Sequence, residues 1–446
     1  RARWSQGEAA LASLAPLLLL WPDAVAGSSA AICAGVGEGG TSRAEEASGA
    51  ALLRWVRERG GTLDGVELQW RGGGWALLAA RDLPAGHTLA RLPAHGVAVS
   101  PRLALSTPPG FRLAHTAGLE AFDMDSLMLT TWLLEQRDSE ESPWAPYLEV
   151  LPAAYPDVGV AFTDEVIRRC AAGLPHVEQF LLAGRKILEQ ELQLLSSLHG
   201  APGLERYRFL WARLTVLTRR FKVRSSTLEA DGRPWREGGM TWRPRPEAEA
   251  VPVNWALLPL FDSLNHAHGS GINCVWGPGL AARTLRPVLA GEELLWSYGD
   301  WNSTVQLAHY GFVVSGNPAD TLDLELQLPG QDSEGQVKHV ALRLCVAVQA
   351  LETALLPFRS GASTPAATPA EVEAAALCRL LAALASAAER LRPQGDCPEV
   401  CRRLHQNFLA LVATWGHFAE RALALLPASA ASGRGCNVDG TGQPSG

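Results

Sequence analysis

The hydrophobic patterning of the chain begins with the two-residue alternation typical of β-strands. This alternation predicts a strand over residues 66–70, and the apolar residues between polar or glycine-rich turns predict two more over residues 75–80 and 88–92. A short helix over residues 51–59 precedes them, and two glycines that suit a helix C-cap follow it. The pattern therefore predicts a compact β unit that ends near Pro101.

Helical patterning then takes over. Hydrophobic residues that recur about every 3.6 positions predict helices within residues 125–199 and a helical continuation over residues 203–221. Residues 229–249 are rich in proline, glycine and charge without any period, which is typical of an exposed loop. Strand-like alternation returns over residues 251–314. A helical insertion at about residues 120–228 thus interrupts a β unit.

The rest of the chain is mainly helical. After a strand around residues 322–326, long apolar helices are expected over residues 338–356, 369–392 and 397–425. The fold class is therefore predicted to be α+β. The expected segments are a leader or disordered region (1–50), an interrupted β domain (51–315), a helical C-terminal domain (316–427) and a disordered tail (428–446).

The composition is that of a folded protein. Hydrophobic residues make up 47% and charged residues 19% of the 446 positions, which is enough apolar surface for more than one core. The net charge of −7, from 39 basic and 46 acidic residues, gives no general attraction to phosphate backbones. Nucleic acid is therefore not an expected partner. No apolar run is long enough to span a bilayer, so a membrane is not expected either.

The N-terminal segment is rich in alanine, glycine and serine. Arg1 and Arg3 stand ahead of an apolar run at residues 11–21, which is typical of a targeting segment. Glu8 and the lack of an initial methionine argue against one. A targeting leader and a disordered segment both remain open.

Eight cysteines are too few and too scattered for a disulfide scaffold, which favours a reducing compartment. Only Cys397 and Cys401 lie close together in the sequence, and this pair lacks the four ligands of a structural zinc site. We therefore expect both to be ordinary buried helix residues, and we expect no metal ion.

Four short motifs are candidates for chemistry. They are GWALLA (74–79), DSLNH (262–266), GEEL with the YG that follows it (291–299) and HYGF (309–312). Taken singly, each has an ordinary structural explanation: a glycine turn, a hydrogen-bonded Asn-His loop, or aromatic packing at a strand end. Their order and spacing are more specific than any one of them.

Together the motifs make the sequence resemble the SET-domain protein methyltransferases, most closely the branch of the Rubisco large-subunit methyltransferase. The resemblance covers residues 51–425. It implies a SET fold that is interrupted by a helical insertion and followed by a helical substrate-binding domain, in agreement with the element order expected above. It also implies transfer of a methyl group from S-adenosylmethionine to a side chain of another protein.

The resemblance implies a cofactor site built from several segments. The loop that contacts the cofactor through its backbone matches Gly74 and Trp75. This chain has Gly73 where relatives have an acidic residue and Ala76 where they have a second glycine. Another matching segment is the pair Asn265 and His266, whose side chains donate and accept hydrogen bonds without adding a fixed charge.

Two further residues match the cofactor site of the family. Arg219 matches an arginine on the carboxylate side of the cofactor, although the adjacent Arg220 is an alternative and so is a solvated helix end. Phe312 matches the aromatic residue that packs on the adenine, with a core role as its alternative. His268 is expected to be incidental, because no third metal ligand stands at a recognisable spacing.

Two tyrosines are the expected catalytic residues. Tyr298 matches the active-site tyrosine, whose hydroxyl helps to align the methyl donor with the acceptor. Tyr310 matches a second tyrosine of lysine-modifying relatives that a histidine-modifying relative lacks, so the resemblance favours lysine as the acceptor. Histidine methylation and a SET-fold binding protein without catalysis are the alternatives, the second because of Gly73 and Ala76.

The resemblance also implies the partners. The helical C-terminal domain is expected to dock a non-histone protein substrate, and S-adenosylmethionine is the expected cofactor. We expect the protein to act as a monomer.

Overall fold

The computed structural model describes most of the chain. The described residues are 43–71, 73–199, 203–224, 227, 253–277, 279–327, 337–343, 369–391, 397–424 and 426. Most of the expected leader, the expected tail and the expected loop at residues 229–249 lie outside these ranges. The chain divides into a β-rich unit (Gly35–Ala161 and Ala183–Asp300) and a C-terminal unit (Arg1–Ala34, Phe162–Leu182 and Trp301–Gly446).

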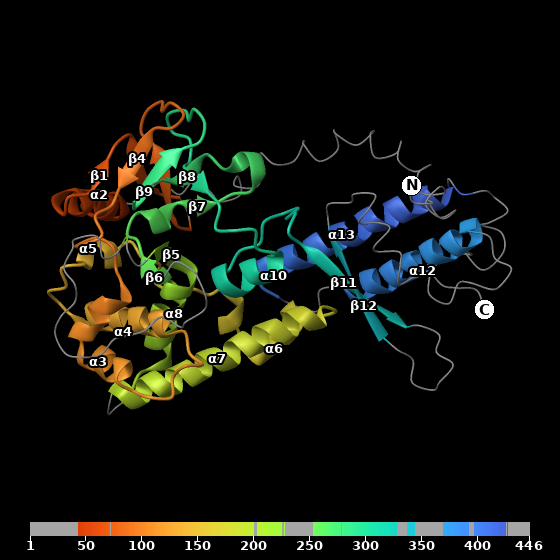
Figure 1. Cartoon of the computed structure of the whole chain (residues 1–446), viewed down its shortest axis with the longest axis horizontal. Helices are drawn as coiled ribbons and strands as arrows, with labels where there is room; N and C mark the ends of the chain where they lie inside the picture. The colour runs from red at the N-terminus through yellow and green to blue at the C-terminus, as the bar shows by residue number, and fades with distance from the viewer. Residues whose placement is uncertain are drawn as a thin grey trace, which may run out of the picture. The chain divides into compact units, whose positions relative to one another are not determined.

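The β-rich unit combines short strands with the helices of the insertion (Figure 1). Its elements in chain order are α2 (Arg43–Glu58), β1 (Thr62–Leu63), β2 (Val66–Trp70), β3 (Trp75–Ala79), β4 (Thr88–Arg91), η2 (Pro101–Ser106), α3 (Pro108–Ala114), α4 (Met124–Asp138), α5 (Ala145–Leu148), η3 (Gly159–Ala161), α8 (Arg206–Arg219), β5 (Arg220–Arg224), β6 (Val253–Leu257), η4 (Phe261–Ser263), β7 (Asn265–His266), η5 (Gly269–Gly271), β8 (Cys274–Gly277), β9 (Ala281–Thr284) and β10 (Leu295–Trp296). Helix α7 (Pro175–His199) belongs partly to each unit.

Strands from both sides of the helical insertion form one sheet. Its order is β1-β4-β9-β8, and all neighbours in it are antiparallel. Strand β4 precedes the insertion and β9 follows it, and they pair with Ala90 opposite Ala282. The β signals read before and after the insertion therefore belong to one structure. Helix α2 begins at Arg43, earlier than the predicted start at residue 51.

Strand β3 is covered on both of its faces. All five of its residues are buried. On one edge it pairs with β2, with Leu68 opposite Leu77, and on the other the backbone N–H of Leu294 donates to the carbonyl of Leu77 at 2.8 Å. Leu78 and Glu293 form a further antiparallel bridge. Two of the four sequence motifs, at 74–79 and 291–294, consequently lie side by side.

The insertion is tied together by a buried ion pair. Arg213 of α8 donates through Nε to Glu191 of α7 at 2.8 Å, and both side chains are buried. The predicted helix over residues 203–221 is correct only as far as Arg219. Arg220 has extended backbone angles, and β5 pairs along its whole length with β6. Pairing with a distant strand therefore overrides the helical pattern there.

The C-terminal unit is mainly helical, as predicted, and it also contains a β-hairpin (Figure 1). Its elements are α6 (Asp164–Cys170), the start of α7, α10 (Ser303–Val305), the π-helix η6 (Gln306–Tyr310), β11 (Thr321–Gln327), β12 (Val337–Arg343), α12 (Pro369–Arg390) and α13 (Glu399–Ala424). The prediction of a helix over 338–356 is wrong for 338–343, because those residues pair in antiparallel register with β11. Residues 344–356 lie outside the described ranges.

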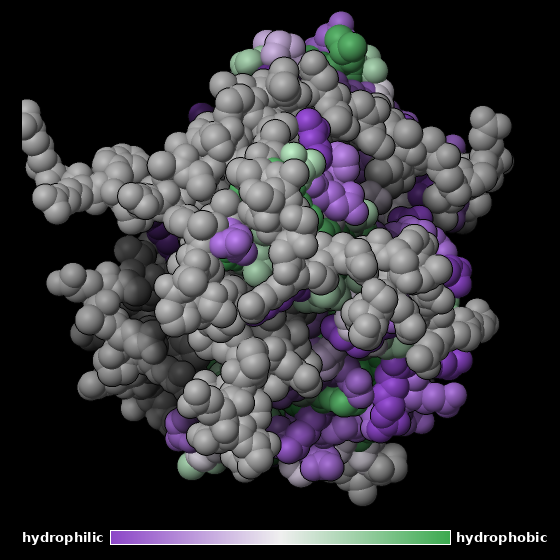
Figure 2. All heavy atoms as spheres, turned by 90° about the vertical axis from the view of Figure 1, so that its right-hand side faces the viewer, coloured by the Kyte–Doolittle hydropathy of each residue, from purple (hydrophilic) through white to green (hydrophobic). Residues whose placement is uncertain are grey.

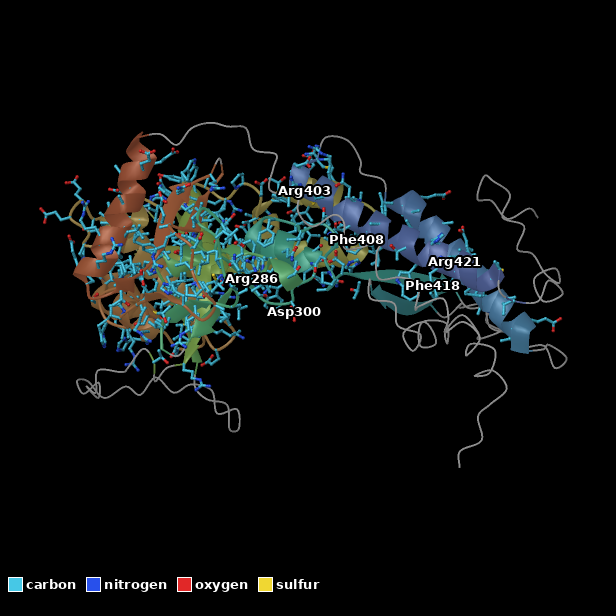
Figure 3. The ribbon with its side chains drawn as sticks, turned by 90° about the horizontal axis from the view of Figure 1, so that it is seen from above. Arg286, Asp300, Arg403, Phe408, Phe418 and Arg421 are labelled. Atoms are coloured by element: carbon cyan, nitrogen blue, oxygen red, sulfur yellow. A yellow bond between two sulfur atoms is a disulfide. The ribbon has the colours of Figure 1, made fainter. Side chains whose placement is uncertain are left out.

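Helices α12 and α13 pack against each other and carry most of the core of this unit. Figure 3 labels four residues of α13, from Arg403 near its start to Arg421 near its end. Phe408 lies between them and is buried, as is Trp415. The apolar stripe of α13 is therefore the face that packs inward.

Cys170 and Cys401 are joined by a disulfide, which corrects the expectation that Cys401 is an ordinary buried thiol. The two cysteines lie 231 residues apart in the sequence, so their spacing carries no signal of the pairing. Beside them, the fully buried His405 places one ring nitrogen 2.8 Å from the carbonyl of Cys170 and the other 3.1 Å from that of Leu391. The ends of α6 and α12 and the start of α13 thus meet at one point.

On the face of the molecule drawn in Figure 2, hydrophilic residues cover most of the coloured surface, with smaller hydrophobic areas between them. Among the described residues, no helix combines the length and the apolar character needed to cross a membrane.

Candidate active site

The Asn265–His266 segment lies between two other parts of the β-rich unit. Strand β7 pairs in parallel with β10, with Asn265 opposite Leu295 and His266 opposite Trp296. The amide nitrogen of Asn265 donates to Oε1 of Glu293 at 2.7 Å and to the carbonyl of Trp75 at 3.3 Å. The predicted cofactor residues Trp75 and Asn265 are therefore in direct contact.

A strained turn precedes this segment. Leu260 is the only described residue other than glycine with a positive φ, at 80° with ψ at −48°. Its side chain is fully buried. Such angles lie near those of a γ-turn and cost a bulky residue energy, so the surrounding core must hold them in place. The turn leads directly into η4, which carries the buried Asp262.

Tyr298 is fixed at both its backbone and its hydroxyl. Its backbone N–H donates to Nδ1 of His266 at 3.0 Å, and its hydroxyl donates to the carbonyl of Leu264 at 2.9 Å. The rings of His266 and Tyr298 lie with their centroids 5.2 Å apart. Gly299 follows with φ at 119°, a conformation that glycine adopts readily. The backbone therefore requires a glycine directly after Tyr298.

His266 is held neutral. Burial lowers its pKa to about 4, and the neighbouring charge of His268 acts in the same direction. Asp300, labelled in Figure 3, and the carbonyl of Trp296 act in the opposite direction but are weaker. A neutral imidazole can accept through Nδ1, which the hydrogen bond from Tyr298 requires.

Arg219 belongs to a buried polar group that we call the Arg219 cluster, made of Arg219, Asp262 and Tyr147. Arg219 donates to the carbonyl of Asp262 at 2.8 Å and approaches its carboxylate at 3.5 Å. The hydroxyl of Tyr147 donates to the same carboxylate at 2.9 Å. Burial raises the pKa of Asp262, while Arg219 and Tyr147 act in the opposite direction. Within the described part of the chain, Nε of Arg219 and Oδ1 of Asp262 are buried without a hydrogen-bond partner.

Arg220, the alternative to Arg219, is engaged elsewhere. Its guanidinium contacts the side chains of Asp123 and Ser126, and it stacks 4.0 Å from the ring centre of Trp255. The structure therefore separates the two adjacent arginines and directs only Arg219 to Asp262.

The glycine bend before β3 borders open space. A Cβ atom added at Gly73 or Gly74 would have no described neighbour within 4 Å. Trp75, by contrast, is buried and packs edge-on against Trp70 with ring centroids 5.6 Å apart. The bend is thus anchored at Trp75 and has room beside its glycines.

Tyr310 and Phe312 belong to the C-terminal unit, whereas the other six predicted site residues belong to the β-rich unit. Tyr310 ends the π-helix η6, and Gly311 follows it with φ at 76°. The rings of Tyr310 and Phe312 are 5.8 Å apart at their centroids, and both side chains are half-buried. The β-rich unit contains the rest, namely Gly74, Trp75, Arg219, Asn265, His266 and Tyr298.

Sequence reasoning missed several partners of these residues. Asp262 and Glu293 stand inside two of the motifs, so their positions carried a signal that was not used. Tyr147 contacts Asp262 across 115 residues of sequence and had no local signal. His268, expected to be incidental, contacts His266. No group of three or more potential metal ligands occurs among the described residues.

No protein-family profile matches the chain. It is 23% identical to the actin-histidine N-methyltransferase of Danio rerio over 288 residues and 23% identical to that of Mus musculus over 296 residues. The alignments cover 62% and 63% of this chain but only 44% and 45% of the two relatives. The chain therefore spans less than half the length of the curated relatives it matches.

Solved structures cover more of the chain. A structure of Rubisco LSMT bound to AdoMet matches with a TM-score of 0.55 and 14% identity, over 84% of this chain and 92% of that one. The SET domain of LSMT bound to lysine and AdoHcy matches with a TM-score of 0.53 and 14% identity, over 84% and 91%. The chain has a SET-domain fold.

The SET fold confirms the predicted α+β class and the predicted resemblance to the Rubisco methyltransferase branch. It explains why a β unit resumes after a long helical insertion and why mainly helical sequence follows it. At 14% identity the likeness shows the fold alone, so the chemistry must be argued from the residues described above.

Proposed function

We propose that the chain is an S-adenosylmethionine-dependent protein N-methyltransferase. The observation that carries this proposal is Tyr298, which is anchored at its backbone by His266 and at its hydroxyl by the carbonyl of Leu264. The Asn-His segment beneath it contacts Trp75, at the glycine bend. A tyrosine fixed in this way at the centre of a SET fold suits the alignment that methyl transfer requires.

The residues present fit the cofactor. S-adenosylmethionine carries an amino-acid carboxylate, and the unpaired buried Nε of Arg219 is a donor that a carboxylate would satisfy. The open space beside Gly73 and Gly74 allows a ligand to approach the backbone closely. Asn265, which is exposed at the start of β7, offers its side-chain amide nearby. Arg219, Asn265, His266 and the bend at Gly74 and Trp75 would hold the cofactor.

The cofactor, when bound, supplies an electrophilic methyl group on a sulfonium sulfur. The protein's task is then to orient an acceptor nitrogen and to keep it uncharged. Tyr298 is placed to orient, because its ring is fixed from two directions. The neutral His266 adds no positive charge beside the acceptor, and this absence of charge favours an uncharged amine.

We propose lysine as the acceptor. The support is Tyr310, which matches a tyrosine of lysine-modifying relatives and lies half-buried at the end of η6. Histidine is the second candidate, because the curated relatives are named actin-histidine N-methyltransferases. Phe312 next to Tyr310 is proposed to contact the adenine ring, and the C-terminal unit is proposed to dock the protein substrate.

Calorimetry with S-adenosylmethionine is the first test of this proposal. A saturable heat of binding is expected for the folded chain. No binding by a folded sample would leave only the catalytically inactive SET-fold protein among the hypotheses.

The second test identifies the acceptor. The purified chain is incubated with isotopically labelled S-adenosylmethionine and an extract of its own cells, and modified peptides are mapped by mass spectrometry. Label on lysine supports the proposal, and label on histidine replaces it with the second candidate. Tyr298→Phe in the same extract is the matched control, because label that persists at the wild-type level comes from another enzyme or removes Tyr298 from catalysis.

A further inference from the structure

His268 contacts the histidine beneath the candidate catalytic tyrosine. Nε2 of His268 lies 3.1 Å from Nε2 of His266, within hydrogen-bonding distance. The two rings meet edge to face, with centroids 4.3 Å apart and an interplanar angle of 86°. Both side chains are half-buried. This geometry suits a directed N–H···N hydrogen bond.

The direction of that bond follows from the other side of the His266 ring. Nδ1 of His266 accepts from the backbone N–H of Tyr298 at 3.0 Å, so Nδ1 carries no proton. A neutral imidazole then has its proton on Nε2, and Nε2 is the donor to His268. Only a neutral His268 with a lone pair on its own Nε2 can accept it.

We propose that His268 is a positioning residue that holds His266 in its Nε2–H tautomer and thereby holds the backbone of Tyr298. The chain of contacts runs from His268 to His266 and from His266 to the N–H of Tyr298. This proposal rests on the proposed function for its catalytic meaning, but the tautomer itself is a property of the protein without substrate.

The proposal carries a pH dependence. Protonation of His268 would turn its Nε2 from an acceptor into a donor that faces another donor, so the bond would be lost. Asp300 favours a positive charge on His266, while each histidine disfavours a charge on the other. Tyr298 is a further titratable neighbour of His266, with the two ring centroids 5.2 Å apart. Acid is therefore expected to weaken the hold on Tyr298.

Two variants separate this role from simple packing. His268→Gln keeps an acceptor close to the place of Nε2 but does not titrate, whereas His268→Leu fills space without an acceptor. At pH 8 the Gln variant is expected to retain kcat within about two-fold, and the Leu variant to lose about ten-fold, roughly the effect of one hydrogen bond. The affinity for S-adenosylmethionine is expected to stay within about two-fold in both.

The pH profile is the readout that a packing role would not change. Wild-type kcat is expected to fall on acidification with a limb that the Gln variant lacks, because only wild type has a titrating acceptor there. Identical profiles in wild type and the Gln variant would overturn the proposal.

Ring ¹⁵N NMR shifts of His266 test the tautomer without any activity. Wild type and the Gln variant are expected to show the Nε2–H tautomer, and the Leu variant a mixture. An unchanged tautomer in a folded Leu variant would also overturn the proposal. Failure of the proposed function has a different signature, because wild type would then bind no S-adenosylmethionine while the His266 tautomer still responded to His268.

Discussion

Two clusters of buried polar residues, one in each unit, differ in whether all their buried polar atoms have hydrogen-bond partners. In the C-terminal unit, Asp320 accepts from the backbone N–H of Ser303 at 2.6 Å and from its hydroxyl at 2.7 Å, and Asn407 of α13 donates to it at 3.2 Å. We call Ser303, Asp320 and Asn407 the Asp320 cluster. In the Arg219 cluster of the β-rich unit, Asp262 and Tyr147 are buried and Arg219 is half-buried, but two buried polar atoms have no hydrogen-bond partner among the described residues.

The difference concerns which buried polar atoms are still able to form a hydrogen bond with a ligand. Buried polar atoms are almost always paired within a folded protein, because leaving one unpaired costs about 1–3 kcal/mol. The Asp320 cluster obeys this rule by joining Trp301–Asp320 to α13, and none of its buried side-chain atoms is without a partner. The Arg219 cluster departs from the rule, so its two unpaired atoms are candidates for contacts with the proposed cofactor.

The largest expected effect is the loss of the Asp320 cluster. Asp320→Ala removes the acceptor of two buried donors of Ser303 and one of Asn407, and we expect it to lower the free energy of unfolding by about 3 kcal/mol. Chemical denaturation measures the change. Glu420→Ala, on the exposed face of α13, is the control and should change stability by less than about 0.5 kcal/mol. Equal stabilities for the two variants would break the comparison.

The next effect should fall on turnover and not on stability. Tyr298→Phe removes the hydroxyl that donates to Leu264, and we expect kcat to fall about 100-fold because a small misplacement of reacting groups is costly. The affinity for S-adenosylmethionine, measured by calorimetry, should stay within about two-fold, because the hydroxyl serves alignment more than binding. A parallel fall in affinity would mean that Tyr298 belongs to the binding site and not to the alignment of the reaction.

A smaller effect tests the unpaired atoms directly. Arg219→Lys keeps a positive charge near Asp262 but removes Nε and the planar fork, so the dissociation constant of S-adenosylmethionine should rise about ten-fold. Arg220→Lys is a matched control in the adjacent position, since Arg220 contacts Asp123 and Trp255 instead. If both variants bind alike, the unpaired Nε of Arg219 has no part in cofactor binding.

The sequence predicts the features that depend on local pattern better than those that depend on distant contacts. Strand β2 follows from its own alternation and β3 from its apolar run, and the ends of β2 agree with the prediction. The first two residues of β5 and all but the first residue of β12 fall within predicted helices, because strand pairing with β6 and β11 depends on contacts outside their own sequence. Local motifs likewise indicated Asn265, His266 and Tyr298.

The partners of these site residues were harder to find. Tyr147 reaches Asp262 from a different helix, and the link between Cys170 and Cys401 joins distant segments. Neither contact leaves a periodic trace in the sequence. Local patterns therefore predict secondary-structure elements and motifs. The hydrogen-bond partners of buried polar side chains and the pairing of cysteines depend on the tertiary fold.

The last expected effect concerns the pH dependence of stability at His266. Its pKa is about 4 in the folded chain, against about 6.5 when unfolded, so between these values the unfolded state binds a proton that the folded state does not. The contribution of His266 to stability is therefore complete above about pH 6.5 and is lost as the pH falls toward 4. Denaturation curves between pH 7.5 and 4.5 should show this decline.

His266→Asn isolates this contribution from the other groups that titrate in the same range. Asparagine keeps an acceptor close to the place of Nδ1 for the N–H of Tyr298 but does not titrate, so the decline in stability between about pH 6.5 and 4 should be shallower in the variant. The same slope in both proteins would show that His266 is as easily protonated in the folded chain as in the unfolded one. The His266 side chain would then be open to solvent in the folded chain, unlike the fully paired and buried Asp320 cluster.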